Sequence, residues 1–380
     1  MATYEKIVRL GLSDAGSSAA EGVNITNARM ALKVERGETQ FAAIGSDRIG
    51  GICHDYSGNI YMTDPAEHAI YKISEGNQIS IFAGKPGTSG DLVDVAIRTS
   101  GTVGTLQAAF NTPQGICCDK AGNIYVADTN NHKIKVISGG KIKLVAGSSG
   151  GFTDADDGKS AQFNRPRGIC VDRQGNLYVS DTFNHAIRKI WTNGKVLTLA
   201  GNGLVGDASN VRASKYTRTF DSPTGISVDA NGNIYVLDYA NYKIKKITPN
   251  GWVYRFSGSG TIGKSLGTND AANGYTYSDN CSYQSLQGCD IDESGNLYVV
   301  DMGWPTAGAW GRLLKLDSNG RPFVIVDFNA LAGMQEIYIY NVTCSPAQKL
   351  FLAISDEYFT EDYSSSSSYI ENWSSSSSST

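Results

Sequence analysis

Short runs of apolar residues, separated by polar turn residues, recur along most of the chain, and residues 168–190 show the pattern most completely. Both faces of the first two runs carry apolar or neutral side chains, as in strands that are covered on both sides. Gly175 stands in the tight turn between them, where glycine permits a positive φ. The stretch therefore predicts three antiparallel strands, at residues 168–172, 177–180 and 186–190.

Copies of this stretch supply the neighbours that such a small sheet needs. Clear copies begin at Gly51, Gly115, Gly168, Gly225 and Gly288, and a degenerate copy begins near Asn341. A further apolar run that ends in glycine stands before four of the five clear copies; these runs begin at Ile81, Leu144, Leu197 and Tyr254. Four antiparallel strands per copy, repeated at this spacing, predict the blades of a β-propeller.

The two ends of the chain are predicted to share the last blade. Residues 39–45 are similar to the outer strand that precedes the later copies, but they come before the first copy and have no blade of their own. Residues 336–354 offer strands that lack such a partner. Joining the two closes the ring and removes free sheet edges. We therefore predict an all-β fold, a six-bladed β-propeller of four-stranded antiparallel blades whose last blade is closed by both chain ends.

The loops after the second strands carry the features of a known family. The runs Asn130–Ile134 and Phe183–Ile187, each preceded by Asp-Thr, resemble NHL repeats. The segments 109–115 and 161–168, which lead into two of the copies, also resemble that family. The resemblance covers residues 37–360 and implies an NHL-type β-propeller. It leaves the function open, because propellers carry unrelated activities.

The ends of the chain do not follow the repeat and are interpreted as separate segments. Residues 1–36 form an N-terminal arm, either a disordered leader or an attachment segment that pairs with another chain; residues 5–10 within it are compatible with a strand. Residues 361–380 form a Ser-rich low-complexity tail that is too polar to fold alone. This tail resembles segments of phage virion proteins.

Composition narrows the possible partners. The formal net charge is −4, so no global basic field attracts nucleic acid or an acidic membrane surface. No apolar run approaches 18 residues, and the first residues lack the apolar core of a signal peptide. We therefore expect no membrane interaction, regard nucleic acid as an unlikely partner, and predict a virion or cytoplasmic location.

Three of the seven cysteines, Cys53, Cys117 and Cys170, hold the same position in three copies, and Ser227 holds it in the fourth. They are either a metal or disulfide constellation or small residues required near a crowded propeller axis. No CxxC spacing exists and free cysteine behaves as a small buried hydrophobe, so we favour the second interpretation and a reducing compartment.

A recurring Asp and His in each copy are predicted to form a structural framework. His68, His132 and His185 fall at one repeat position and are expected to bond the Asp of their own blade, while Tyr242 replaces them in the fourth copy. The framework set is Asp64, His68, Asp128, His132, Asp181, His185, Asp238 and Asp301. Lysines and arginines of the third strands are expected to be solvated; they are Lys133, Lys135, Arg188, Lys189, Lys243, Lys245 and Lys246.

No catalytic set, metal site or cofactor is predicted. Amidating lyases and streptogramin lyases of similar fold use histidines, but only His54 lies outside the recurring position here. Asp154–Gly158 suggests a calcium loop through its carboxylates, yet it lacks the ligand spacing and closing Glu of an EF-hand. The NHL resemblance implies an Asp-Gly turn in this loop, and we favour that interpretation over a metal site.

Long loops that share one face of the predicted propeller mark that face as its working surface. The connections from each outer strand to the next inner strand are long, at residues 85–113, 148–166, 202–223 and 259–286. The candidate ligand-binding residues near that face are Tyr275, Tyr277, Tyr283, Trp304 and Trp310, together with the basic cluster Arg212, Lys215 and Arg218. The alternatives are that the aromatic residues pack their own loops and that the charges are merely exposed.

These features predict a non-catalytic binding or scaffold propeller. Its sharper form is a virion or appendage component of a phage, joined to protein neighbours through its terminal arms and presenting the long-looped face to a protein or glycan. The alternatives are an intracellular NHL protein-interaction module and an NHL-type lyase or hydrolase.

Overall fold

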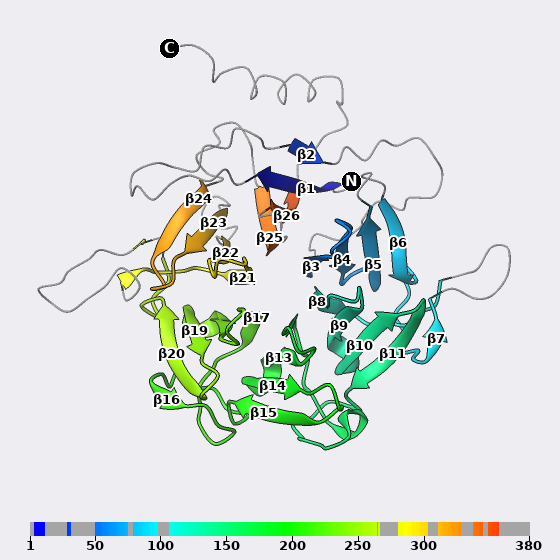
Figure 1. The fold of residues 1–380 in the computed structure, drawn as a ribbon, viewed down its shortest axis with the longest axis horizontal. Helices are drawn as coiled ribbons and strands as arrows, with labels where there is room; N and C mark the ends of the chain where they lie inside the picture. Colours follow the sequence, from blue (N-terminus) through cyan, green and yellow to red (C-terminus); the bar gives the residue numbers. More distant parts are fainter. Residues whose placement is uncertain are drawn as a thin grey trace, which may run out of the picture.

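The computed structural model describes residues 4–11, 29–31, 50–74, 79–97, 106–263, 265–266, 280–302, 311–327, 337–344 and 349–356. Five antiparallel blades follow one another around a common axis, and a sixth sheet lies between the last and the first of them (Figure 1). The described elements are strands and four short 3-10 helices. The predicted all-β propeller of four-stranded antiparallel blades is confirmed.

The blades are numbered here from the first copy of the repeat. Blade 1 consists of β3 (Ile52–His54), β4 (Ile60–Asp64), β5 (Ala69–Ile73) and β6 (Ile79–Gly84). Blade 2 consists of β8 (Pro113–Cys118), β9 (Ile124–Asp128), β10 (Lys133–Ser138) and β11 (Lys141–Ala146). Blade 3 consists of β12 (Gly168–Val171), β13 (Leu177–Asp181), β14 (Ala186–Ile190) and β15 (Val196–Ala200).

Blades 4 and 5 repeat this order. Blade 4 consists of β17 (Pro223–Val228), β18 (Ile234–Asp238), β19 (Lys243–Ile247) and β20 (Trp252–Ser257). Blade 5 consists of β21 (Leu286–Ile291), β22 (Leu297–Met302), β23 (Gly311–Leu316) and β24 (Pro322–Asp327). The short helices are η1 (Thr129–Asn131), η2 (Gly158–Ser160), η3 (Thr182–Asn184) and η4 (Tyr239–Asn241).

Two blades gain a fifth strand that the repeat did not predict. The two-residue strands β7 (Val95–Ala96) and β16 (Val211–Arg212) pair with β11 and β20 at the outer edges of blades 2 and 4. Both come from the long connections, which therefore cover edges that would otherwise be open.

The sixth sheet is built from both ends of the chain, as predicted, but from different residues. From the inside, its order is β25 (Ile337–Cys344), β26 (Lys349–Asp356), β1 (Tyr4–Gly11) and β2 (Arg29–Ala31). We expected residues 39–45 to supply the N-terminal strand; they lie outside the described residues, and β1 pairs with β26 along all eight of its residues. Part of the predicted N-terminal arm thus belongs to the ring.

The core lies between the blades, which explains why both faces of the inner strands are apolar. One cluster joins Cys117 and Ala127 of blade 2 to Ile169, Leu177 and Val179 of blade 3. Equivalent clusters join blades 1 and 2, 3 and 4, and 4 and 5. Removing these side chains from water is the main stabilising contribution to a stack of sheets.

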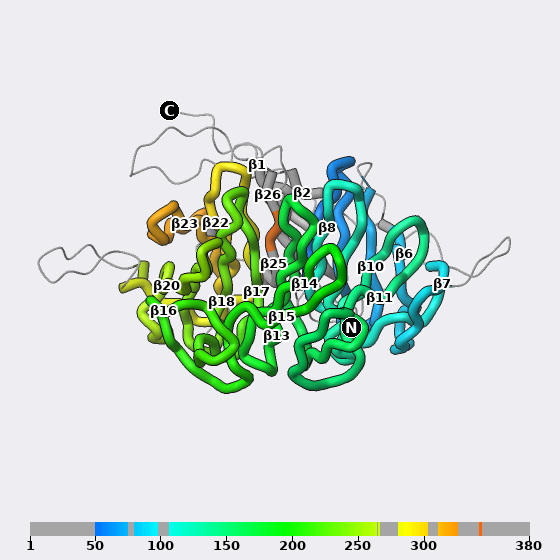
Figure 2. Tube along the Cα trace, turned by 60° about the horizontal axis from the view of Figure 1, so that its bottom comes forward, coloured from blue at the N-terminus to red at the C-terminus, as the bar shows by residue number. Residues whose placement is uncertain are grey.

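The two ends of the propeller differ. The loop face carries the long connections and the short helices that follow each second strand, and the turn face carries the tight turns between first and second strands. Figure 2 shows the long green connections below the ring and the tight turns above it. Gly175 has a φ of 87° in one of these turns, as predicted.

Candidate functional site

A buried ion pair anchors the long connection of each of blades 2 to 4. Asp128, Asp181 and Asp238, at the ends of the second strands, are fully buried and pair with Lys135, Arg188 and Lys245 of the third strands, at 2.7, 2.8 and 2.8 Å. In blade 5, Asp301 and Arg312 form the same pair at 2.8 Å. The prediction that the third-strand cations are solvated is therefore wrong for Lys135, Arg188 and Lys245.

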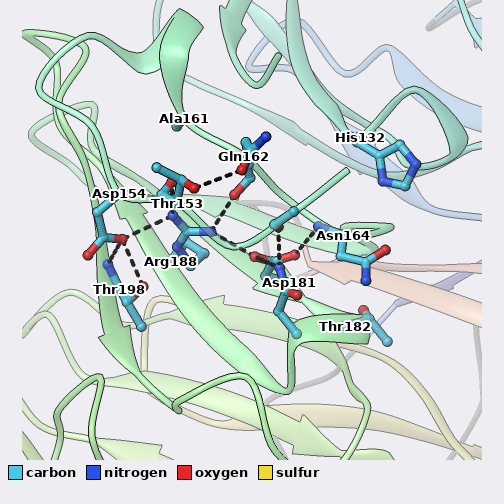
Figure 3. Close-up of polar contacts among 12 residues, drawn as sticks. His132, Thr153, Asp154, Ala161, Gln162, Asn164, Asp181, Thr182, Arg188 and Thr198 are labelled. Atoms are coloured by element: carbon cyan, nitrogen blue, oxygen red, sulfur yellow. Dashed lines mark hydrogen bonds and ion pairs between the residues drawn. The ribbon is translucent and has the colours of Figure 1, made fainter. Parts of the chain in front are cut away.

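The bonding around Arg188 shows what the pair does (Figure 3). Arg188 Nη1 donates to the carbonyl of Gln162, and Nη2 donates to the carbonyl of Thr153 and to the carboxylate of Asp154. Asp181 accepts the backbone N–H of Asn164 at 2.7 Å. The cation and its carboxylate thus tie the connection 148–166 to the blade.

The suggested calcium loop is explained by the same contacts. Asp154 accepts hydrogen bonds from Arg188 and from the backbone and hydroxyl of Thr198. Asp156 pairs with Lys195, and Asp157 accepts the backbone N–H of Lys159 at the start of η2. These carboxylates each have a protein partner, and no group of three or more potential metal ligands gathers within the described residues.

The recurring histidines brace the next blade rather than their own, which corrects the expected Asp–His bond. Nδ1 of His68, His132 and His185 accepts the backbone N–H of Thr112, Arg165 and Ser222, at 3.0, 3.1 and 3.0 Å. Each of these backbone donors lies just before the first strand of the following blade. Each histidine also has a positive φ, between 47° and 57°. The framework residues therefore hold neighbouring blades in register.

A cavity of about 310 Å³ lies on the axis at the turn face. The inner strands line it with one small side chain from each blade, namely Cys53, Cys117, Cys170, Ser227, Cys289 and Thr343. The six cysteines whose side chains the structure describes are free, and Cys53, Cys117 and Cys170 among them are buried. Burial raises the pKa of these three thiols well above its ordinary value. Their repeat position thus places them at the axis, as small residues in a tight ring.

His54, which has no counterpart in the other copies, belongs to a hydrogen-bonded chain in this cavity. Thr343 Oγ1 donates to Asp290 Oδ2 at 2.9 Å, and His54 Nδ1 lies 3.1 Å from the same hydroxyl. Because the hydroxyl has one proton and gives it to the carboxylate, Nδ1 must be the donor to Thr343 and Nε2 then carries the lone pair. Burial lowers the pKa of His54, against the raising effect of Asp290 and Asp55, which favours this neutral form.

The loop face carries only part of the predicted ligand-binding set. Arg212, Lys215 and Arg218 are exposed in the connection 202–223, as expected. Tyr275, Tyr277, Trp304 and Trp310 lie outside the described residues. Tyr283 has no exposure: it packs in the core between blades 4 and 5, and its hydroxyl lies 2.6 Å from Ser257 Oγ. Tyr283 is therefore a core residue and not a surface anchor.

Other apolar side chains are exposed on that face instead. Those on the long connections and on η3 are Leu92, Phe152, Phe183, Leu204, Val205, Tyr216, Ile262 and Leu266. Tyr216 is 80% exposed, the largest value among them. Their only signal in the sequence is an apolar residue inside a polar connection, and no aromatic cluster marks them.

The arrangement defines a β-propeller whose blades come from a repeated sequence and whose two ends carry different surfaces. The model of the family described as "NHL repeat" matches residues 110–137, 163–190 and 220–247, which span most of blades 2, 3 and 4. Three successive blades of the propeller therefore contain NHL repeats, which confirms the resemblance. No helix in the described part of the chain is long and apolar enough to cross a membrane.

Similar proteins share parts of the chain. Human NHL repeat-containing protein 2 is 33% identical over 155 residues, which cover 37% of this chain and 21% of that protein. Human teneurin-4 is 33% identical over 158 residues, 36% of this chain and 5% of that protein. The chain thus spans about a fifth or less of these relatives. A solved gluconolactonase from Xanthomonas campestris has a TM-score of 0.50 and 12% identity, covering 81% of this chain and 86% of that one, which is a likeness of fold.

Proposed function

We propose that the protein is a non-catalytic binding and scaffold module that engages a protein partner through its loop face. The distribution of exposed apolar side chains carries the proposal. Of the large hydrophobic residues that are exposed in the described residues, eight lie on the loop face, and only Tyr56, Tyr254 and Phe323 lie elsewhere. Apolar residues gathered on one face of a soluble domain are typical of an interaction surface.

Two places on this face have the composition of binding hot spots. The Phe183 ring, 45% exposed, lies 5.0 Å from the guanidinium of Arg165 and 5.8 Å from that of Arg167. The Tyr216 ring lies 5.7 Å from Lys215 Nζ. Aromatic residues and arginine dominate the energy of protein interfaces, and the buried ion pairs hold their loops in place before binding.

The test compares two faces of one protein. The purified wild type and the variant Phe183→Ser/Tyr216→Ser are used as baits in the native source, with Tyr56→Ser as the matched control. Tyr56 is 60% exposed but lies on the turn face. We expect a partner retained by the wild type and by Tyr56→Ser, and lost at least about tenfold in the loop-face variant. Equal retention by all three would overturn the proposal, and a glycan array with the same three proteins decides whether the ligand is a glycan instead.

We further propose that the terminal segments connect the propeller to protein neighbours in a virion or appendage. The sequence of the Ser-rich tail supports this assignment. Residues 4–11 pair with β26 inside the last blade, so the proposed connections use the terminal residues beyond these two strands. Electron microscopy of purified particles, with an antibody to this chain, tests it. Particles that lack the chain would contradict it.

A lyase or hydrolase is the second candidate function, and the axial cavity favours it. The chain of hydrogen bonds from His54 through Thr343 to Asp290 leaves Nε2 of a neutral imidazole as a proton acceptor in a cavity of about 310 Å³. A screen of lactone and ester hydrolysis with the wild type and His54→Gln tests this candidate. Turnover that His54→Gln lowers by about 100-fold or more would favour the enzyme over the binding module.

A further inference from the structure

The loop face carries a local positive charge in spite of the net charge of −4. Arg165, Lys215 and Arg218 are exposed on its connections, and Arg212 is exposed beside them on β16, at the outer edge of blade 4. None of the four forms a salt bridge within the described part of the chain.

Three carboxylates on the same connections already have cationic partners, whereas Asp94 and Asp157 are exposed and form no salt bridge with a described residue. Asp91 pairs with Lys133 and Lys135, Asp154 with Arg188, and Asp207 with Lys243 and Lys245. Since the framework neutralises these acids and leaves the loop cations unmatched, the surface next to Tyr216 favours an acidic ligand.

The chain itself contains a segment with the complementary composition. Residues 357–373 contain four acidic residues and no lysine or arginine; the acids are Glu357, Glu361, Asp362 and Glu371. The same segment contains six large apolar or aromatic residues, which are Tyr358, Phe359, Tyr363, Tyr369, Ile370 and Trp373. Its structure lies outside the described residues.

The segment starts on the loop face. In blades 1 to 4 the second strand ends there, at Asp64, Asp128, Asp181 and Asp238. β26 is the second strand of the sixth sheet and ends at Asp356, which pairs with Ile337 at the start of β25 and with Tyr4 at the start of β1. The strand that precedes the segment therefore ends on the loop face.

The segment is long enough to reach the cations. Its 17 residues span up to about 55 Å when extended. A domain of this size is roughly 50 Å across by the usual scaling of radius with length. Blades 3 and 4, which carry the exposed cations, are thus within reach from the sixth sheet.

Two other occupants fit less well. Single-stranded nucleic acid uses aromatic side chains for base stacking, but this face also exposes the aliphatic Leu204, Val205 and Ile262, which offer no stacking surface. The segment of a second copy has the same chemistry, but a tether of this length gives the segment of the same chain a millimolar effective concentration. The intramolecular contact therefore forms first.

We propose that residues 357–373 dock in cis on the loop face, with their carboxylates against Arg212, Lys215 and Arg218 and their aromatic side chains against Tyr216 and its apolar neighbours. The proposal rests on the proposed function, because it makes the same face the binding surface. A partner must displace the segment, so the partner's apparent affinity equals its intrinsic affinity multiplied by the fraction of molecules in which the face is open.

The test uses full-length protein at low salt. Hydrogen exchange of the amides in residues 202–223 is compared between the wild type and a neutralised variant, Glu361→Gln/Asp362→Asn/Glu371→Gln. Docking predicts that exchange in this connection is about tenfold faster in the variant. A zero-length carbodiimide reaction should also join Lys215 to Glu361, Asp362 or Glu371 within one chain, with a yield independent of protein concentration.

Charge reversal separates docking from altered folding. Arg212→Glu/Lys215→Glu/Arg218→Glu should lose the protection from exchange, and adding Glu361→Lys/Asp362→Lys/Glu371→Lys should restore it. The matched control, Lys141→Glu/Lys143→Glu on the exposed outer strand β11, should leave it unchanged.

Three results would overturn the proposal: equal exchange in the wild type and the neutralised variant, cross-links that join two chains and increase with concentration, or protection that appears only when oligouridine is added. If residues 202–223 show no protection from exchange but Phe183→Ser/Tyr216→Ser still loses the protein partner, the docking proposal is wrong and the proposed function is supported.

Discussion

Asp181 and Arg188 form an ion pair inside blade 3, with 2.8 Å between Asp181 Oδ2 and Arg188 Nη1 and no exposure of either side chain. Lysine takes the place of arginine in blades 2 and 4, at Lys135 and Lys245. A buried cation is thus common to three blades, and each also bonds the carbonyls of its own long connection. The loop face consequently depends on charges that lie beneath it.

Replacing Arg188 by methionine should destabilise the protein strongly. Arg188→Met leaves the Asp181 carboxylate buried without its cation, and such losses cost about 3–5 kcal/mol. Arg188→Lys keeps the charge, as blades 2 and 4 do, and loses only part of the bonding to Gln162 and Thr153, at a cost of about 1–2 kcal/mol. Urea unfolding at pH 7 measures both. A value for Arg188→Met within 1 kcal/mol of the wild type would show that the pair is dispensable.

Replacing Gly168 by alanine should also destabilise the protein, for a steric reason. A Cβ on Gly168 would lie 2.1 Å from the carbonyl oxygen of Thr224 in the next blade, which is too close for any real contact. The inner strands cannot separate without opening the packed core between blades, so we expect a loss of about 2–4 kcal/mol. Gly122→Ala is the control for adding a methyl group, because nothing lies within 4 Å there, although its φ of 80° adds local strain. Thermal unfolding of both variants makes the comparison.

The strands of each blade could be predicted from the sequence because residues close together in the chain determine them. The strands β12, β13 and β14 agree with the predicted ranges to within a residue, because turn residues and apolar runs act over a few positions. Long-range pairing is not local. Residues 5–10 and 39–45 both resemble strands in the sequence, and only the pairing of β1 with β26 shows that residues 4–11 enter the last blade.

The candidate site was less predictable for a similar reason. Lys135 and Lys245 alternate with apolar residues as a solvated strand does, and the connection that covers them comes from elsewhere in the sequence. His54 was distinguished by lacking a counterpart, but its partner Thr343 belongs to a degenerate copy almost 290 residues away. Tyr283 was assigned to the surface because its segment is long and polar, whereas its ring fills the core between two blades.

The axial cysteines should resist alkylation in the folded protein. Burial raises the pKa of Cys53, Cys117 and Cys170 well above its ordinary value, and it raises that of Cys118 to about 12. Since the thiolate is the reactive species, labelling by iodoacetamide at pH 8 should be at least about 100-fold slower than in urea. Mass spectrometry of labelled peptides measures each site. Rapid labelling of Cys117 in the native protein would contradict the ring of buried thiols.

The buried His54 should make the protein less stable as the pH falls. Burial lowers its pKa below the ordinary 6.5, so between the folded and the unfolded value the unfolded chain binds more protons than the folded one. Stability therefore rises with pH in that window and is lost as pH falls below about 6.5, by at most about 1.4 kcal/mol per pH unit for one group. Urea unfolding from pH 7.5 to 5.0 should show a shallower loss in His54→Gln than in the wild type. Burial raises the pKa of Asp181 to about 6, so the stability that Asp181 contributes changes with pH in the opposite direction. Both proteins contain Asp181, and the difference between their curves therefore reports His54 alone. Parallel curves would show that His54 has the same protonation in the folded and unfolded states, and the neutral imidazole assigned to the axial cavity would then be wrong.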